Sequence, residues 1–281
     1  MVIAVLSVLL FCLVLLRLIG FQGRSAPQKA GDVAYGFSQM QGLQEVQADR
    51  GEVVKTNAGV LGILADGIGR ENTGKVSAQI AVDTAADAFE PYQTLTNPSY
   101  FFRTVFHEAD VRIQQTIGER RGGACLALVF IGGGMLHYAL AGDIRIGLVR
   151  NGELIPLSKG HTLDVLAKEA YEAGKISRKE AIWSFDEKRR WNYVGMDGFH
   201  DVEEPEQPIR LKEGDVCVLI TRGIWQSMSE AQLEDMLQGT ESLAEKARQI
   251  AWYAGRIPKK DQENGSVLLL DVGAAARGGN A

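Results

Sequence analysis

Short apolar runs bounded by glycine or aspartate constrain the fold of this 281-residue chain more than any other feature. Apolar runs of about 4–8 residues between turn residues are typical of β-strands. Such runs lie at residues 33–37, 60–65, 126–131, 136–141, 144–149, 216–220 and 267–272. Several follow one another through short turns between residues 124 and 157, and the glycines at 132–134 supply the positive φ that a hairpin needs. The sequence therefore predicts antiparallel sheets.

Three further segments predict helices that pack outside these sheets. Apolar residues recur at helical spacing within residues 76–89 and again within residues 98–117. A third helix is expected after Ser242, whose spacing from Glu245 predicts a capping box. Strand runs and helices of this kind indicate an α+β fold.

Composition and charge narrow the function classes. Hydrophobic residues make up 46% of the chain, charged residues 23%, and the formal net charge is −5. Without a dense basic stripe, the chain lacks the usual electrostatic source of nucleic-acid affinity, so no nucleic-acid partner is expected. Cys12, Cys125 and Cys217 lie in apolar runs without the close Cys or His neighbours of a zinc site, and they are interpreted as core residues.

The N-terminal segment predicts a membrane anchor. Residues 2–16 carry no charge or proline, and residues 18–21 extend the apolar stretch nearly to bilayer length. The positive charges Arg17, Arg24 and Lys29 all follow the stretch, which favours a transmembrane helix with the C-terminal part in the cytoplasm over a cleaved signal peptide. We expect an anchor at residues 1–21, a linker at 22–31, one folded domain at 32–272 and a disordered tail at 273–281.

The most informative motif is a buried strand that ends in Asp66 and Gly67. Taken alone, an Asp-Gly pair is common turn chemistry. Three more segments place a charged residue beside a strand. These are Asp143 between two strands, Arg222 after the strand 216–220, and Glu263 with Asn264 before the last strand.

In this order and spacing the segments resemble the type 2C protein phosphatases, whose sequences carry Ala-Asp-Gly-Met-Gly-Gly, Gly-Asp-Ser-Arg, Ser-Asp-Gly-Leu-Trp and Asp-Asn motifs. The resemblance covers residues 32–272. It implies a layered α/β/β/α sandwich of two antiparallel sheets flanked by helices. It also implies hydrolysis of phosphoserine or phosphothreonine, assisted by Mg²⁺ or Mn²⁺ that carboxylate oxygens hold.

Matching the motifs residue by residue assigns candidate metal ligands and phosphate contacts. Asp66 matches the bridging carboxylate, Gly67 a carbonyl ligand, Asp49 the early acidic residue and Asp143 an accessory ligand, and Glu263 stands in the terminal Asp-Asn motif. Arg70 and Arg145 are candidate contacts on the phosphate side of the site.

The departures from the family motifs concern the same site. Arg222 stands where the family has the aspartate of Ser-Asp-Gly, so a cation replaces a metal ligand. Gln44 stands where relatives have a phosphate-gripping arginine, and Ile144 replaces the serine of Gly-Asp-Ser-Arg. Arg222 is expected to pair with Asp66 or Glu263 and to take over the charge of the metal. The alternative is that Arg222 points to solvent and leaves a weakened metal site.

Two function classes follow from these matches and departures. The favoured hypothesis is a degenerate phosphatase-like module, without a cofactor, that binds a cytoplasmic protein or phosphoprotein. The alternative is an active Mg²⁺- or Mn²⁺-dependent phosphatase. A minor alternative is a nucleotide loop at residues 69–75, whose glycines and Lys75 nearly match a P-loop, although Val76 stands at the Ser/Thr position.

Overall fold

The computed structural model describes residues 33–70, 72–185 and 189–273, and within them two antiparallel five-stranded sheets lie face to face. The first sheet has the order β1 (Tyr35–Met40), β10 (Gly265–Asp271), β9 (Val216–Ile220), β6 (Arg145–Arg150) and β7 (Glu153–Pro156). The second has the order β2 (Arg50–Thr56), β3 (Gly59–Gly69), β4 (Gly122–Gly132), β5 (Met135–Ala141) and β8 (Ile209–Arg210).

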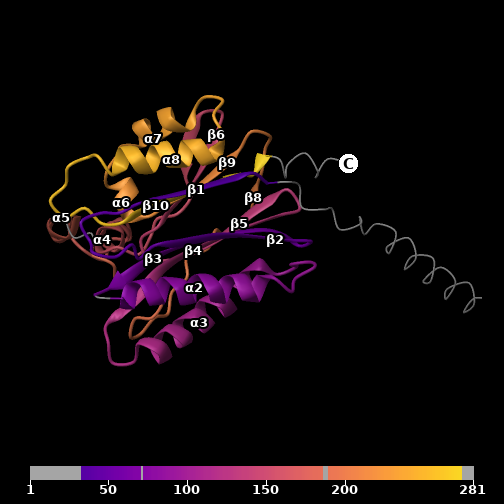
Figure 1. Ribbon diagram of the computed structural model, residues 1–281. Helices are drawn as coiled ribbons and strands as arrows, with labels where there is room; N and C mark the ends of the chain where they lie inside the picture. The colour runs from indigo at the N-terminus through magenta and orange to yellow at the C-terminus, as the bar shows by residue number, and fades with distance from the viewer. Residues whose placement is uncertain (1–32, 71, 186–188, 274–281) are drawn as a thin grey trace, which may run out of the picture.

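Helices cover the outer face of each sheet (Figure 1). The helices α2 (Thr73–Phe89) and α3 (Pro98–Ile117) lie on the second sheet, and α7 (Glu230–Leu237) and α8 (Leu243–Ala254) lie on the first. The helices α4 (Leu163–Glu172), α5 (Arg178–Phe185) and α6 (Arg222–Trp225) gather at one end of the sandwich, opposite the end at which the described chain begins and finishes.

The layers enclose three apolar clusters. Leu64, Leu140 and Leu268 belong to the cluster between the sheets, Phe89 and Phe106 to the one between the second sheet and its helices. A third cluster joins the first sheet to α7 and α8. Because β3 and β4 are covered on both faces, their residues are buried almost without interruption rather than in alternation. The predicted α/β/β/α sandwich is therefore confirmed.

Sequence patterns missed some elements. The strand β2 has partly exposed residues throughout, and β7 and β8 are very short, so none of them shows an apolar run. The predicted capping box of α8 is half formed, because the Ser242 hydroxyl accepts from the Glu245 amide while the Glu245 carboxylate binds Arg248. A complete box instead begins α7.

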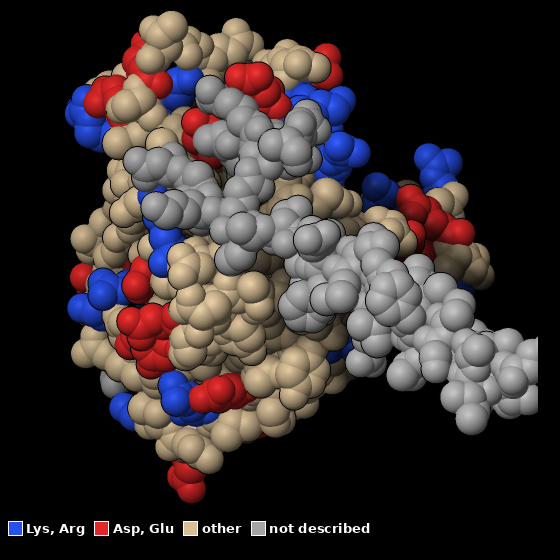
Figure 2. All heavy atoms as spheres, turned by 90° about the vertical axis from the view of Figure 1, so that its right-hand side faces the viewer, with Lys and Arg blue, Asp and Glu red and all other residues tan. Residues whose placement is uncertain are grey.

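The predicted anchor and linker lie outside the described residues, as does the tail from residue 274. Within the described ranges, no helix combines the length and apolarity that crossing a bilayer requires. The face at which the described chain begins shows acidic and basic side chains interspersed over the visible surface (Figure 2).

The close packing of α8 on β1 allows a test of the layer that α8 forms on the first sheet. A Cβ on Gly36 would lie 2.1 Å from the Leu243 carbonyl oxygen, a backbone atom at the start of α8. We expect Gly36→Ala to lower the free energy of unfolding by about 2 kcal/mol, as overpacking typically does. Urea denaturation measures this change.

Gly255→Ala at the other end of α8 is the matched control. Its Cβ would meet only ordinary contacts, at 3.4 Å from the Ala251 oxygen and beyond, and its φ of −67° suits alanine. Equal unfolding midpoints for the two variants would contradict the described packing of α8.

Candidate functional site

Acidic residues from both sheets meet at the end of the sandwich that carries α6. Asp66 lies near the end of β3, Asp49 precedes β2, Asp143 lies between β5 and β6, and Glu263 precedes β10. Arg222 begins α6 directly after β9. The structure thus brings together five of the residues that the sequence singled out.

A sharp glycine turn delivers Asp143 to this cluster. Gly142 has a φ of 108°, and a Cβ there would lie 2.5 Å from the Cys125 side chain, so both backbone and space require glycine. The Asp143 amide then donates to the Cys125 Sγ at 3.2 Å. Burial raises the pKa of this thiol to about 12, which keeps Cys125 in its unreactive thiol form.

Arg190, which the sequence analysis did not single out, joins two of the carboxylates. Its Nη2 lies 2.8 Å from Asp66 Oδ2 and 2.9 Å from Glu263 Oε2. The Arg190 side chain is 14% exposed and that of Asp66 is 8% exposed. Although burial acts to lower it, neighbouring carboxylates, Asp66 foremost, hold the pKa of Arg190 above its ordinary value. This guanidinium is therefore a fixed cation inside the cluster.

Arg222 joins the next pair. Its Nε donates to Asp143 Oδ2 at 2.5 Å, its Nη2 contacts the same oxygen, and its Nη1 lies 3.5 Å from Glu263 Oε1. The predicted pairing with Glu263 is therefore present, whereas Asp143 rather than Asp66 is the main partner. Glu263 uses one oxygen for each arginine, so charges alternate along Asp66, Arg190, Glu263, Arg222 and Asp143. We call these five residues the charge chain.

Asp49 lies beside the charge chain in a hydroxyl cradle. Its Oδ2 accepts hydrogen bonds from Thr221 Oγ1 at 2.9 Å and Ser266 Oγ at 2.7 Å. Its buried Oδ1 has no hydrogen-bond partner within the described ranges. Burial and the negative charge of Asp66 raise the pKa of Asp49 well above its ordinary value. Both causes favour the neutral carboxyl.

The donor set does not fit the divalent cations that the family resemblance implies. Mg²⁺ and Mn²⁺ need several anionic oxygens aimed at one point. Here Arg190 and Arg222 engage oxygens of Asp66, Glu263 and Asp143, and both guanidinium groups would repel a cation. No group of three or more His, Cys, Asp or Glu side chains in the described ranges is arranged to hold an ion. The expected metal ligands are thus assembled, but two guanidinium groups already offset two of their negative charges.

A histidine network holds the segment that carries Arg190. The Trp191 amide donates to the His161 carbonyl at 3.0 Å, and the two rings lie 4.9 Å apart. The Gly142 amide donates to His161 Nδ1 at 3.2 Å, and Asn192 Nδ2 lies 2.8 Å from the same nitrogen. Burial lowers the pKa of His161, which keeps Nδ1 free to accept. This buried histidine ties the Arg190 segment to the Asp143 turn.

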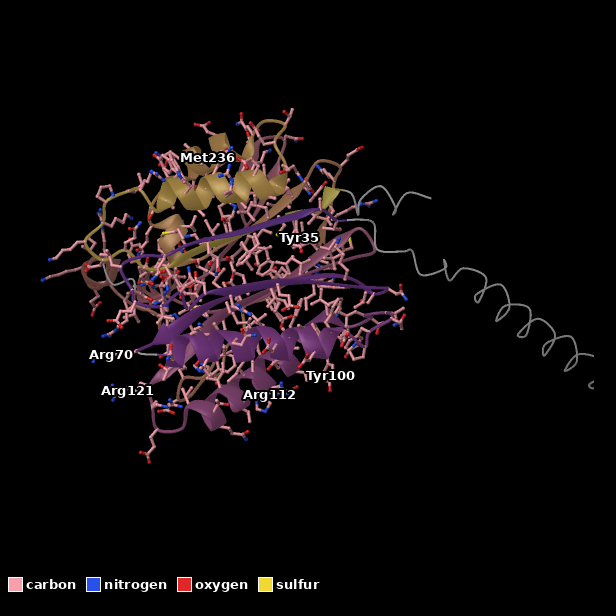
Figure 3. All side chains as sticks on the ribbon, in the orientation of Figure 1. Tyr35, Arg70, Tyr100, Arg112, Arg121 and Met236 are labelled. Atoms are coloured by element: carbon pink, nitrogen blue, oxygen red, sulfur yellow. The ribbon has the colours of Figure 1, made fainter. Side chains whose placement is uncertain are left out.

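The two predicted phosphate contacts, Arg70 and Arg145, lie outside the charge chain. Arg145 stacks on the Trp225 ring with its Cζ 3.9 Å from the ring centre. Arg70 and Arg121 lie near one another at the end of the second sheet (Figure 3). Together with Arg120 and Tyr193 they line a separate cavity of about 500 Å³, which no member of the charge chain lines.

The remaining expectations concern Gly67 and the motif of Glu263 with Asn264. Gly67 lies against α2, since a Cβ there would meet the Gly74 oxygen at 2.3 Å. Its role as a carbonyl ligand stays a prediction. Asn264 Nδ2 donates to Gln44 Oε1 at 3.2 Å and to the Val46 carbonyl at 2.7 Å, so this amide fastens the loop before Asp49.

The loop at residues 69–75 does not have the surroundings of a nucleotide loop. P-loops follow a strand of a parallel sheet, whereas β3 pairs antiparallel with both β2 and β4. The Thr73 hydroxyl donates to the Arg70 carbonyl at 2.8 Å, which closes the loop on itself. The minor alternative therefore has no structural support.

The Asp143 pKa yields a pH test of the charge chain. Burial raises this pKa to about 6, against the opposing attraction of Arg222 and Arg190. An unfolded aspartate has a pKa of about 3.9, so the native state binds the proton more tightly. This tighter proton binding stabilises the folded state. Its contribution to the free energy of unfolding is fully present below the unfolded pKa and is lost as pH rises through 6. We expect wild type to lose up to about 3 kcal/mol relative to Asp143→Asn between acidic and neutral pH.

Urea denaturation at a series of pH values measures this difference, because Asp143→Asn removes the titrating group and serves as the reference. Parallel pH profiles of the two proteins would show that Asp143 titrates alike in the folded and unfolded states.

Comparisons with known proteins agree with this fold. No protein-family model matches the chain. It is 25% identical over 255 residues to the serine/threonine phosphatase stp of Listeria welshimeri serovar 6b, covering 84% of this chain and 98% of that protein. It is 26% identical over 218 residues to the protein phosphatase PhpP of Streptococcus pneumoniae, covering 75% of this chain and 85% of that protein.

Solved structures give the same result for the fold. The S. agalactiae serine/threonine phosphatase superposes with a TM-score of 0.74 at 22% identity, covering 85% of this chain and 98% of that one. The catalytic domain of the phosphatase PstP, solved in complex with two manganese ions, gives a TM-score of 0.68 at 21% identity, covering 85% and 97%. The chain is therefore a relative of the type 2C, or PPM-type, serine/threonine protein phosphatases.

Proposed function

We propose that this chain is a phosphatase-like module without metal-dependent catalysis, which binds a protein partner in the cytoplasm at the membrane surface. The observation that carries the proposal is the charge chain. Asp66, Asp143 and Glu263 bear three negative charges, and Arg190 and Arg222 supply two positive ones within hydrogen-bonding or ion-pair distance. A bound cation would have to displace both guanidinium groups before it reached those oxygens.

Displacing them is costly. A buried charge that loses its partner destabilises a protein by about 3–5 kcal/mol, because the remaining charge stays desolvated. The Arg222 and Asp143 side chains are 9% and 7% exposed, so their ion pair is of this kind. Metal binding would therefore have to offset the loss of two such pairs. This argues for a structural rather than a catalytic centre.

The orientation of the domain suits a tethered binding module. The described chain begins at the end of the sandwich opposite α6 (Figure 1). With the N-terminal segment as a transmembrane anchor, the charge chain and the loops around it would face away from the bilayer. Such a surface is open to a cytoplasmic protein or phosphoprotein.

An active phosphatase is the second candidate. The relatives stp and PhpP are named phosphatases. The resemblance to the family motifs places Asp49, Asp66 and Asp143 at metal-ligand positions. In that case Arg190 and Arg222 would have to leave their carboxylates when Mg²⁺ or Mn²⁺ binds.

Hydrolysis measurements separate these two candidates. We expect the full chain in detergent to show negligible Mn²⁺-dependent hydrolysis of a chromogenic phosphate ester and of a phosphothreonine peptide. We expect Arg190→Ala/Arg222→Asp to bind Mn²⁺ in calorimetry, because it frees the oxygens of Asp66 and Glu263 and adds a carboxylate. Arg256→Gln, which removes a surface guanidinium stacked on Trp252, is the control. Metal-dependent turnover by the wild-type chain would overturn the proposal.

A stability measurement tests the structural role of Arg222 separately. We expect Arg222→Met to lower the free energy of unfolding by about 3–5 kcal/mol, because Asp143 would remain buried without its partner. Arg222→Met/Asp143→Leu, which removes both charges, should recover most of the loss. Urea denaturation at neutral pH measures both. An unchanged stability in the single variant would show that the pair contributes nothing to the fold.

A further inference from the structure

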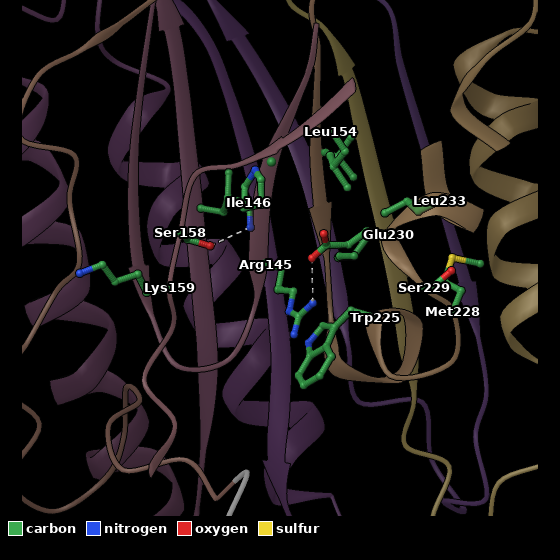
Figure 4. A pocket seen from close by; sticks show the side chains of 14 residues that line it. Arg145, Ile146, Leu154, Ser158, Lys159, Trp225, Met228, Ser229, Glu230 and Leu233 are labelled. Atoms are coloured by element: carbon green, nitrogen blue, oxygen red, sulfur yellow. Dashed lines mark hydrogen bonds and ion pairs between the residues drawn. The ribbon is translucent and has the colours of Figure 1, made fainter. Parts of the chain in front are cut away.

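A pocket of about 210 Å³ opens on the outer side of the first sheet, beside α7 (Figure 4). Its lining is largely apolar and comes from β6, β7 and β9 on one side and from the α6–α7 segment on the other. The apolar side chains that the following argument uses are Leu154, Ile220, Trp225, Met228 and Leu233. The polar groups at its rim include Arg145, Lys159 and Glu230.

Arg145 is the exceptional group in this pocket. Its guanidinium stacks on Trp225, and its only ion pair within the described ranges is a 4.0 Å contact with Glu230 Oε1. That distance is too long for a hydrogen bond, and the two side chains are 47% and 65% exposed, so the pair is weak. Figure 4 shows Arg145 between Trp225 and Glu230, with Lys159 directed away.

Lys159 does not compete for the same ligand. Its Nζ lies 2.7 Å from Glu169 Oε1, so its charge is already paired on the far side of the rim. Arg145, in contrast, has only the long contact with Glu230, so its guanidinium has N–H donors that the described chain leaves without hydrogen bonds. A planar guanidinium binds a carboxylate through two parallel hydrogen bonds.

The neighbouring sheet edge is closed to strand addition. The strand β7 ends the first sheet, and an exposed edge can pair with another extended chain. Here the Leu154 amide donates to Glu234 Oε1 at 2.8 Å, and Pro156 has no N–H. A ligand at this place is therefore recognised through side chains and not through backbone pairing.

The size of the pocket restricts the ligand. Pockets for cofactors and drug-sized molecules measure roughly 300–1,000 Å³. A cavity of about 210 Å³ accommodates an apolar side chain and part of its neighbour.

From the apolar lining, the size and the unsatisfied guanidinium, we propose that this pocket binds a segment of a partner protein in which an acidic side chain adjoins a bulky apolar one. The apolar side chain enters between Leu154, Met228 and Leu233, and the carboxylate replaces Glu230 as the partner of Arg145. The inference rests on the proposed function, since it names the partner chemistry of the binding module.

The pocket shares its walls with the charge chain. Arg145 follows Asp143 by two residues at the start of β6, and Trp225 closes the α6 helix that Arg222 opens. The same two segments therefore meet twice, through the ion pair of Asp143 with Arg222 and through the stack of Arg145 on Trp225. A rigid charge chain would hold the pocket in its binding-competent form.

Fluorescence polarisation with labelled octapeptides tests the proposal on the full chain in detergent. The probes carry Leu-Asp-Leu, Leu-Asn-Leu or Leu-Lys-Leu at their centre. We expect the aspartate peptide to bind about tenfold more tightly than the other two, since a hydrogen bond to a charged group contributes at least that factor. Equal binding of the three peptides, or no binding of any, would overturn the proposal.

Protein variants assign the binding to this pocket. Arg145→Gln should weaken binding of the aspartate peptide about tenfold, and Glu230→Gln should strengthen it, because the competing carboxylate is gone. Arg256→Gln removes another guanidinium that stacks on tryptophan, 3.7 Å from the Trp252 ring, and should leave binding unchanged. Thermal unfolding checks that each variant folds, and unchanged binding by folded Arg145→Gln contradicts the assignment.

Two further readings separate this inference from its alternatives. Sedimentation of the wild-type chain as a dimer that Arg145→Gln dissociates would make a second copy the occupant, and the proposal would be wrong. Phosphate-ester hydrolysis by the same samples tests the proposed function independently. Turnover together with the expected peptide pattern would refute the non-catalytic proposal and leave the pocket assignment standing.

Discussion

The charge chain at the end of the sandwich is the interaction on which the rest of this site depends. Asp66 belongs to the second sheet, Glu263 precedes a strand of the first, and Asp143 lies in the connection between them. Arg190 and Arg222 join these carboxylates into one series of ion pairs. Asp66 and Asp143 are buried and Glu263 is partly exposed. Without counter-charges, three carboxylates this close together would repel one another and protonate. The two arginines therefore supply the charge balance that lets the two sheets approach here.

The fold was largely predictable because its signals are local. Apolar runs predicted β3, β4, β5, β6, β9 and β10, and helical spacing predicted α2, α3 and α8. The strand β2 escaped because none of its residues is fully buried and its apolar pattern is weak. The half-formed box at Ser242 shows the limit of short motifs, since Arg248 competes for the Glu245 carboxylate that the motif assigns to the backbone.

The candidate site was predictable as a set of positions and not as a set of contacts. Matching motifs brought Asp49, Asp66, Asp143 and Glu263 together correctly, because the strand order fixes where each motif lies. The partner of Asp66 escaped prediction. Arg190 follows another arginine in the chain, and nothing in that local pattern tells which one turns inward. The signal lies in the fold, through the contacts of Trp191 and Asn192 with His161.

Two guanidinium groups differ from two metal ions in a way that bears on function. A metal centre takes its positive charge from ions in solution, so its occupancy depends on the ion concentration. Metal binding also releases protons from the ligands. The charge chain carries its positive charge on residues of the same polypeptide. We therefore propose that its formation is part of folding and does not respond to divalent cations. A domain built in this way would present one stable surface. The pocket that Arg145 and Trp225 line would then keep one conformation, because β6 and α6 connect it to the charge chain.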